Sequence, residues 1–386
     1  MSNSTRACAL VAPHSFKVIE IPLPPMGPKD VRVTPQAVGV CGTDFHIADG
    51  AGNYNLTPSG EPIPLAQEAQ ILGHEIVGKV VEIGSAVHDI QVGQSVVLDQ
   101  GLSCISHYRT DLCEYCSSGA SHQCETYTEY GITGLAGGFS EELIVPAINV
   151  LETSGARSPS ECALTEPLAC MLHTTGMLND ARQRYTLKSK DAASRVHTIL
   201  IMGAGPAGLL MTQVLRGALG FEGTLLVSEP NPYKRTLVAS FGAEVWDANE
   251  PGIEDWIQEK SDGRMLEWAF EASGAGPAFA SMPRLLRKQA TVIKYGIGHQ
   301  GQGLELLNDF HWKEPTFLMP VGASSPFDQD GRATYYRQAL EWIESGKVQV
   351  EPLITHRYAG LEQVPQALGD DHKDANYVKG IVEFQV

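Results

Sequence analysis

A buried-strand pattern that runs directly into a glycine-rich turn is the feature that most constrains the fold of this 386-residue chain. Residues 198–202, Thr-Ile-Leu-Ile-Met, are mostly apolar, and Gly-Ala-Gly-Pro-Ala-Gly follows at 203–208. An apolar helix is predicted over 209–219, where Gly220 ends it. Apolar runs of this kind are typical of strands buried on both faces of a parallel sheet. The pattern therefore predicts a Rossmann-type doubly wound sheet with a dinucleotide site at this turn.

Each position of the turn has a physical role in that prediction. Gly203 permits the tight turn, Gly205 lets a pyrophosphate approach the backbone, and Gly208 lets helix and strand pack closely. Pro206 lacks an N–H, which costs little at a helix start, and Ala207 lies beside it. We predict that these five residues bind the cofactor. A glycine turn without a ligand is the alternative.

An acidic residue follows the next predicted strand, at 224–228. Glu229 lies at the distance after the glycines that is expected of a partner for the ribose 2′-hydroxyl, and its charge would repel a 2′-phosphate. NAD is therefore favoured over NADP. Lys234 and Arg235 lie nearby and leave NADP open. The same turn followed by a Glu also fits an FAD-binding fingerprint, although that motif usually opens a flavoprotein chain, whereas here it lies past the midpoint.

The rest of the chain suggests two domains. Strands predicted at 243–246, 265–270 and 290–295 alternate with helices and extend the parallel sheet. Earlier, strands at 31–40, 77–84 and 92–98 with glycines at the bends predict a small all-β barrel or sandwich. A helix at 332–345 precedes two further strands, at 352–358 and 380–384, which we assign to the first domain.

Composition and charge exclude several classes of function. The chain is 43% apolar and 19% charged, with a formal net charge of −17, which is typical of a globular protein and unfavourable for nucleic acid or an anionic membrane. No apolar run is long enough to cross a bilayer, and the start has no secretory pattern. We therefore expect a cytoplasmic protein in which the eight cysteines do not form a disulfide framework.

Two short motifs suggest a metal site. Cys41 opens the sequence Cys-Gly-Thr-Asp-Phe-His, and His74 belongs to Gly-His-Glu at 73–75. Thiolate and imidazole together suit zinc, and a catalytic zinc usually has three protein ligands and an open position. The alternative is a packed Cys and a His satisfied by its neighbours.

A cluster of cysteines suggests a second metal site. Cys113, Cys116 and Cys124 are spaced C-x₂-C-x₇-C, and four thiolates close a structural zinc site. Cys104 is the candidate fourth ligand, but it lies farther away than a tight turn requires. Asp111 and His107 are rival donors, and a loop of free thiols is the alternative to a metal.

The chain resembles the zinc-dependent medium-chain dehydrogenase/reductases. The resemblance rests on the motifs above together with Glu-Pro-Leu-Ala at 166–169 and Ile-Thr-His at 354–356, taken in chain order. Within that family, a Glu in the segment 166–169 resembles the pattern of the branch that acts on sorbitol, other polyols and sugars. The resemblance implies an α/β chain with a GroES-like β-barrel catalytic domain and a Rossmann domain. It places the catalytic domain at 1–165, with the structural zinc lobe at 100–126, the Rossmann domain at 166–345, and a return to the catalytic domain at 346–386.

Carried over by position, the resemblance assigns roles in the catalytic site. Cys41, His74 and Glu166 would be zinc ligands, with Glu75 as an alternate or outer ligand. Asp44 would orient the His74 ring. Cys170 and His173 compete with Glu166 for the third position. Thr43 and His46 resemble the family's proton relay, although His46 could equally be a surface imidazole.

The implied activity is hydride transfer from a secondary alcohol of a polyol, sugar or cyclitol to NAD, giving the ketone or lactone. Zinc and NAD are the implied cofactors, and a homodimer or homotetramer is the family's habit. Two rivals are a flavin-dependent oxidoreductase and a non-catalytic nucleotide-binding relative. The sequence departs from the family pattern at Thr110, where the lobe usually has its first Cys, and in a long loop at 49–70.

Overall fold

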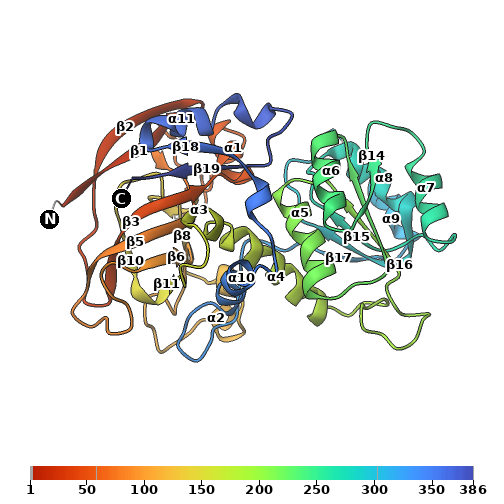
Figure 1. Ribbon diagram of the computed structural model, residues 1–386, viewed down its shortest axis with the longest axis horizontal. Coiled ribbons are helices and arrows are strands. Elements are labelled where there is room, and N and C mark those ends of the chain that lie inside the picture. The colour runs from red at the N-terminus through yellow and green to blue at the C-terminus, as the bar shows by residue number, and fades with distance from the viewer. Residues whose placement is uncertain (1–2, 58, 302, 386) are drawn as a thin grey trace. The chain divides into compact units, whose positions relative to one another are not determined.

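The computed structural model describes residues 3–57, 59–301 and 303–385. The chain forms two compact units: unit 1 comprises Met1–Ala169 and Gly322–Val386, and unit 2 comprises Cys170–Val321. Figure 1 shows both, and each is described here by itself.

Unit 2 is built on a six-stranded sheet whose described strand pairs are all parallel. From edge to edge its strands are β14 (Glu244–Asp247), β13 (Thr224–Glu229), β12 (Thr198–Met202), β15 (Leu266–Glu271), β16 (Leu286–Lys294) and β17 (Thr316–Leu318). In chain order this is third, second, first, fourth, fifth, sixth, the order of dinucleotide-binding sheets. The doubly wound sheet predicted from the sequence is confirmed.

Helices cover this sheet. They are α5 (Pro206–Gln213), which continues as a π-helical turn at Val214–Ala218, α6 (Pro232–Ser240), α7 (Ile253–Lys260), α8 (Gly276–Leu285) and α9 (Leu306–His311). In Figure 1, α5 and α6 lie across one face, and α8 lies with α7 and α9, both of which it contacts. Every residue of β12 and β15 is buried, as the continuous apolar run at 198–202 predicts.

Unit 1 is predominantly β-structure. Its main sheet runs in the order β11-β6-β5-β3-β19-β18, with β10 also paired to β3, and two smaller sheets are β2-β1-β4 and β7-β8-β9. The strands are β1 (Ser4–Ala12), β2 (Ser15–Pro22), β3 (Asp30–Gly39), β4 (Gln70–Ile71), β5 (Glu75–Ile83), β6 (Ser95–Leu98), β7 (Gly101–Leu102), β8 (Thr128–Tyr130), β9 (Gly134–Leu135), β10 (Leu143–Pro146), β11 (Val150–Glu152), β18 (Ile354–Ala359) and β19 (Lys379–Glu383). Because β19 pairs with β3, the two ends of the chain share one sheet.

Short helices connect these strands. They are α1 (Gly42–Ala48), α2 (Glu114–Ser117), α3 (Pro159–Cys162), α10 (Thr334–Glu344) and α11 (Val364–Ala367), while α4 (Thr165–Asp180) begins in unit 1 and continues into unit 2. The main apolar core of the unit consists of buried residues from β1, β3, β5, β6, β10 and the C-terminal strands. The strands β1 and β2 were not predicted; β2 contains only half-buried and exposed residues, so it lacks the apolar face of a core strand.

The observed units differ from the expected domain boundaries at the C-terminal side. Residues 322–345, which the sequence analysis assigned to the Rossmann domain, pack with unit 1. Arg332 explains this placement, since its guanidinium donates to the carbonyl oxygens of Val150 (2.8 Å) and Ala147 (3.3 Å) and pairs with Asp89 (2.6 Å). These contacts join distant parts of the chain, so no local pattern could have revealed them. Among the described residues, no helix is both long and apolar enough to cross a membrane.

Candidate metal and dinucleotide sites

Strand pairing brings the two metal motifs together. Gly39, the last residue of β3, pairs with Glu75, the first residue of β5, so Cys41 and His74 lie just beyond the ends of neighbouring strands. One ligand atom each of Cys41, His74 and Glu75 lies within 4.8 Å of the others. A sulfur, an imidazole nitrogen and a carboxylate oxygen therefore converge at one point, as a catalytic zinc requires.

Asp44 connects the two segments that carry these donors. Its Oδ2 accepts a hydrogen bond from the Cys41 backbone N–H (2.9 Å), and its Oδ1 accepts one from Gly73 (3.2 Å). The same Oδ1 lies 3.5 Å from His74 Nδ1, so this edge of the ring faces Asp44. Burial lowers the pKa of His74, but the charges of Asp44 and Cys41 outweigh it and raise the pKa. The carboxylate thus faces the ring, and its orienting role stays a prediction.

The chemistry of this donor set fits a zinc ion. His74 is 2% exposed and Glu75 is fully buried, yet Glu75 Oε2 has no hydrogen-bond partner among the described residues. Burying polar atoms unpaired is costly, and a cation among the three donors would remove that cost. The residues present therefore suit the metal that the two motifs predict.

A buried lysine lies on the other side of Glu75. Lys379 Nζ, 2% exposed, donates to Glu75 Oε1 at 2.5 Å. Burial alone lowers the pKa of Lys379, but the negative charge of Glu75 more than offsets this and raises it. At Gly39 an added Cβ would lie 1.8 Å from Glu75 Oε2, so the glycine makes room for this carboxylate. Lys379 was not among the predicted site residues, because nothing local distinguishes it from a surface lysine at a strand start.

Glu166 lies in the first turn of α4 and is 5% exposed. Within the described part of the chain it is outside the group of three donors, and its Oε1 accepts a hydrogen bond from Gln100 Nε2 at 3.1 Å. Cys170 and His173 were the alternatives to Glu166 as third ligand. Cys170 is buried at the start of unit 2. Burial lowers the pKa of His173. The structure thus groups Glu75, the expected alternate ligand, with Cys41 and His74.

The expected relay residues flank the same site. Thr43 and His46 lie on α1 and are both half-buried. The Cys41 thiol donates to Thr43 Oγ1 at 3.8 Å, so the hydroxyl lies next to the group of donors. Asp44 on the same helix is fully buried, which anchors α1 at this point.

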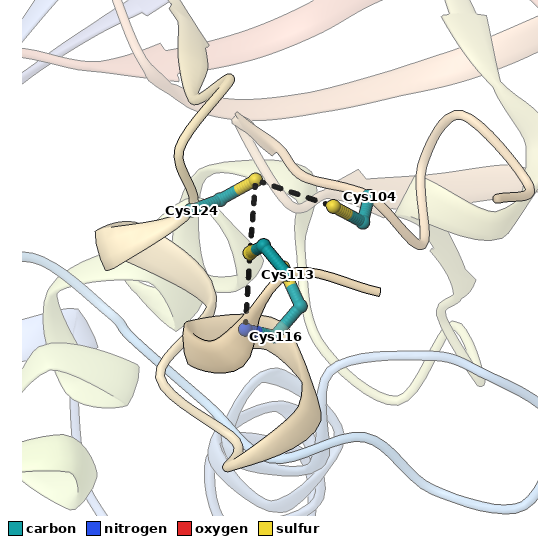
Figure 2. A group of neighbouring side chains, drawn as sticks. All are labelled: Cys104, Cys113, Cys116 and Cys124. Atoms are coloured by element: carbon teal, nitrogen blue, oxygen red, sulfur yellow. Dashed lines mark hydrogen bonds between the residues drawn. The ribbon is translucent and has the colours of Figure 1, made fainter. Parts of the chain in front are cut away.

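The second cluster gathers all the cysteines predicted for it. Figure 2 shows the four side chains converging, and their sulfur atoms lie within 4.8 Å of one another. Cys104 Sγ is 3.7 Å from Cys124 Sγ, which in turn is 4.0 Å from Cys113 Sγ. Backbone N–H groups, first that of Cys116, lower the pKa of the Cys113 thiol to about 6, which favours the metal-binding thiolate.

Cys104 therefore reaches the cluster despite its distance in the sequence. It follows β7 and is fully buried, whereas Cys113 precedes α2 and Cys124 follows the turn at Ser121–Gln123. Its rival Asp111 is exposed and pairs instead with Arg109 at 2.9 Å. Neither Asp111 nor His107 belongs to the group among the described residues.

The dinucleotide turn has the geometry that its glycines require. Gly203 has a φ of +97°, which side-chain-bearing residues rarely adopt, and a Cβ at Gly208 would lie 2.0 Å from Gly203 O. At Gly205, the residue before α5, an added Cβ would meet nothing within 4 Å. Pro206 and Ala207 form the first turn of that helix. The backbone N–H groups of a helix start are therefore left accessible at Gly205, as anion binding demands.

Glu229 supports this turn directly. Its Oε2 accepts from the Ala204 N–H at 2.7 Å, and its Oε1 accepts from Asn231 at 2.9 Å. Arg235 is engaged by the carbonyl oxygens of Glu229 and Pro230 and pairs with Asp247 at 2.8 Å. Lys234 is half-buried.

A further carboxylate at this sheet edge escaped the sequence analysis. Glu271, at the end of β15, is fully buried, and its Oε1 accepts from the Ser273 and Gly274 N–H groups. Its Oε2 lies 2.8 Å from His299 Nε2. The signal was present, since Glu271 ends an apolar strand just as Glu229 does.

A dinucleotide-type sheet and a buried donor set for zinc define a class, the zinc-dependent nicotinamide oxidoreductases. The family models for the alcohol dehydrogenase GroES-like domain and for zinc-binding dehydrogenase match residues 27–155 and 206–345. The chain belongs to the zinc-binding alcohol dehydrogenase family and is a dehydrogenase. The family and the fold predicted from the motifs are confirmed.

Individual relatives span nearly the whole chain. An L-threonine 3-dehydrogenase of Pyrococcus furiosus is 28% identical, covering 92% of this chain and 91% of its own. An L-galactonate-5-dehydrogenase of Escherichia coli is 26% identical, covering 96% and 95%. A structure described as a zinc-binding dehydrogenase of Sinorhizobium meliloti bound to NADP superimposes with a TM-score of 0.77 at 26% identity, covering 99% of this chain and 100% of the other. These relatives do not favour the flavin alternative.

Proposed function

We propose that this protein oxidises a secondary alcohol of a polyol, sugar or sugar acid to the ketone, with NAD as the hydride acceptor. The convergence of Cys41, His74 and Glu75, with a buried carboxylate oxygen that a cation would pair, is the observation that carries the proposal. Relatives named for threonine and galactonate both act on a secondary hydroxyl, which supports this reaction class.

A zinc ion held by these donors would act as a Lewis acid that lowers the pKa of a bound alcohol. The chain's own residues supply the rest of the chemistry. Asp44 holds the His74 ring and the Cys41 backbone in place, so the donors are preorganised. Thr43 Oγ1, next to the Cys41 sulfur, accepts the substrate proton, and half-buried His46 passes it to solvent.

Glu75 and Glu166 have different roles in this proposal. Glu75 supplies the third ligand, because its Oε2 is unpaired while Lys379 balances its charge through Oε1. Glu166 acts beside the metal, since Gln100 engages its Oε1. The four-cysteine lobe holds a second zinc with a purely structural role, because four thiolates leave no open position.

For the cofactor we propose NAD over NADP. Glu229 is held beside the glycine turn by two backbone N–H groups, so a negative charge is fixed where a 2′-phosphate would have to lie. Arg235 is already engaged by carbonyl oxygens and Asp247. Lys234, on α6 next to Arg235, is the residue that would favour a phosphate, and the NADP bound to the S. meliloti protein makes a direct comparison necessary.

For assembly we propose a homodimer, or a tetramer built from it, that forms through unit 2. The edge strand β17 is paired on one side only, by β16. Exposed apolar side chains flank it in the chain, with Leu304 (84%), Leu307 (56%) and Trp312 (77%) before it and Met319 (63%) and Val321 (55%) after it. An apolar sheet edge of this kind is a pairing surface, and a second copy is the occupant that matches it. Cys41 and the four cysteines of the second site would have to stay reduced to bind metal, so we propose a cytoplasmic location.

The decisive experiment is an activity screen combined with one substitution. Polyols, aldoses, inositols, sugar acids and threonine are assayed with NAD and NADP in parallel. We expect NAD-dependent turnover, and Cys41→Ser should abolish it by removing the catalytic metal while NADH still binds. Cys162→Ser, a buried thiol outside both clusters, is the control that keeps activity. Full turnover by Cys41→Ser would refute the site, and a zinc-loaded wild type that binds NADH without turnover would indicate a non-catalytic relative.

A further inference from the structure

A single buried amide joins two carboxylates next to the candidate metal site. Gln100 is fully buried between β6 and β7. Its Nε2 donates to Glu129 Oε1 on β8 and to Glu166 Oε1 on α4, both at 3.1 Å. Neither acid has more than 8% of its surface exposed. The two N–H groups of one side chain therefore serve two acids from different elements of unit 1.

A buried tyrosine determines which end of the amide faces these acids. Tyr336 on α10 is fully buried, and its hydroxyl donates to Gln100 Oε1. An amide has one oxygen acceptor and one NH₂ donor group, so a hydroxyl donor at the oxygen directs both N–H groups at the carboxylates. Each polar atom of the Gln100 side chain then has a complementary partner.

Without the Gln100 amide, the close approach of the buried Glu129 and Glu166 carboxyl groups would be unfavourable. Glu129 and Glu166 are like charges in a poorly solvated region, and Asp99 adds a third buried carboxyl group next to Gln100. Burial raises the pKa of Glu129, and the Gln100 N–H opposes that shift. A neutral donor shared by two acids lets them lie close together in one defined geometry.

The network lies close to the metal site through β8, the strand that carries Glu129. Gly131 directly follows this strand and lies against Gly73, since a Cβ added at Gly131 would be 2.5 Å from Gly73 O, and His74 is the next residue. Because Gln100 engages Glu166 Oε1, the carboxylate can act on the metal only through Oε2 or by displacing the amide. Building on the proposed function, we propose that Gln100, locked by Tyr336, is a positioning residue that orients the Glu166 carboxylate beside the Cys41–His74–Glu75 group.

Cobalt substitution tests this directly, because cobalt spectra respond to the ligand geometry rather than to turnover. In the full-length protein, Gln100→Met keeps the length of the side chain and removes its polar atoms. We expect shifted cobalt absorption bands for the Cys41 group and an affinity for that metal about 10- to 100-fold weaker. Tyr336→Phe, which removes only the hydroxyl that fixes the amide, should shift the bands less and in the same direction.

A matched control separates positioning from general loss of packing. Tyr130→Phe removes a buried hydroxyl on β8, the strand that carries Glu129, but that hydroxyl donates to the Ile144 carbonyl and takes no part in the network. Its spectrum should match the wild type. If Gln100→Met does not fold, Tyr336→Phe decides alone.

The possible results separate the two proposals. Wild-type protein without cobalt bands from a site with one thiolate would refute the proposed function itself. Wild-type bands that Gln100→Met and Tyr336→Phe leave unchanged, with unchanged metal affinity, would overturn the positioning role and leave the proposed function intact. Shifts of the cobalt bands in Tyr130→Phe as large as those in Gln100→Met would also overturn the positioning role, because they would reflect a general change in packing.

Discussion

Single residues in unit 1 are organised around buried charge. Glu75 pairs with Lys379, Glu166 and Glu129 share Gln100, and Asp99 lies beside them. Buried ionisable groups are stable only when partners compensate for lost hydration. Of these groups, Asp99 is the least well compensated, since its Oδ1 accepts a bond from the Gly101 N–H at 3.1 Å but neighbouring acids oppose its charge.

Asp99 predicts a pH dependence of stability. Burial, with the nearby charges of Glu129 and Glu166, raises its pKa to about 7. Between about pH 4 and 7 the folded state therefore holds a proton that the unfolded state has lost, so this group makes folding less favourable as pH rises. Asp99→Asn removes the effect and keeps an acceptor for Gly101. Its free energy of unfolding relative to wild type should rise by a few kcal/mol between pH 4 and 8.

Urea unfolding of both proteins across this pH range measures that difference. Effects of pH on the metal ligands are common to both proteins and cancel in the comparison. Glu68→Gln, at an exposed position of unit 1, should show a flat difference. A flat profile for Asp99→Asn would show that Asp99 is ionised in the folded state at all these pH values.

At the level of elements, strand and helix ends carry the chemistry in both units. The β3–β5 pairing brings Cys41 and His74 together, and the β12–α5 turn forms the nucleotide cradle. Such sites depend on backbone conformation more than on side-chain type, and glycine substitutions test them directly.

Substitution of two glycines in one turn by alanine should affect different properties, stability at Gly208 and cofactor binding at Gly205. At Gly208 an added Cβ overlaps Gly203 O, so Gly208→Ala should destabilise unit 2 by about 1–3 kcal/mol or more. At Gly205 the Cβ meets no protein atom, so Gly205→Ala should keep its melting temperature and lose about tenfold or more in NADH affinity. Thermal melts and NADH fluorescence titrations measure both. Unchanged NADH binding by Gly205→Ala would show that the pyrophosphate binds elsewhere.

The cysteine lobe makes a second prediction at this scale. Cys104 is buried within the cluster, so Cys104→Ser should lower the zinc content by one ion per chain. Cys8→Ser, which removes a buried thiol outside both clusters, should leave the zinc content at the wild-type value. Metal analysis after gel filtration distinguishes them. Retention of all zinc by Cys104→Ser would mean that three cysteines suffice or that another residue completes the site.

At the scale of the whole molecule, unit 2 presents an apolar surface that a lone chain would leave in water. Trp312 and Met319 are large exposed side chains that flank β17 in the chain. A closed symmetric pair is the simplest assembly that covers such an edge.

The substitution Trp312→Glu combined with Met319→Glu should therefore yield a monomer. Charges at this edge oppose strand pairing between copies and remove apolar area from the contact. Sedimentation velocity measures the mass. Leu56→Glu, at a half-exposed apolar residue of unit 1, should retain the wild-type assembly. A doubly substituted protein of unchanged mass would place the interface elsewhere.

The sequence alone determined the features that depend on local pattern. The run at 198–202 with its glycines predicted the strand, the turn and the helix, because buried parallel strands are apolar throughout and few residues other than glycine tolerate the backbone of that turn. The spacing of Cys113 and Cys116 predicted a metal lobe, because two residues suffice for a turn that brings two sulfurs together. The short strand β17, by contrast, lacked a pattern strong enough to predict it.

Only the tertiary structure decided which distant residues meet. Glu75 joined Cys41 and His74 because β3 and β5 pair in one register, Lys379 reached Glu75 through β19, and Tyr336 reached Gln100 from the segment that returns to unit 1. These contacts link residues separated by long stretches of chain, and each depends on the burial and pairing of whole strands. A local pattern carries no record of such pairing, so the partners of a buried charge became visible only in the folded chain.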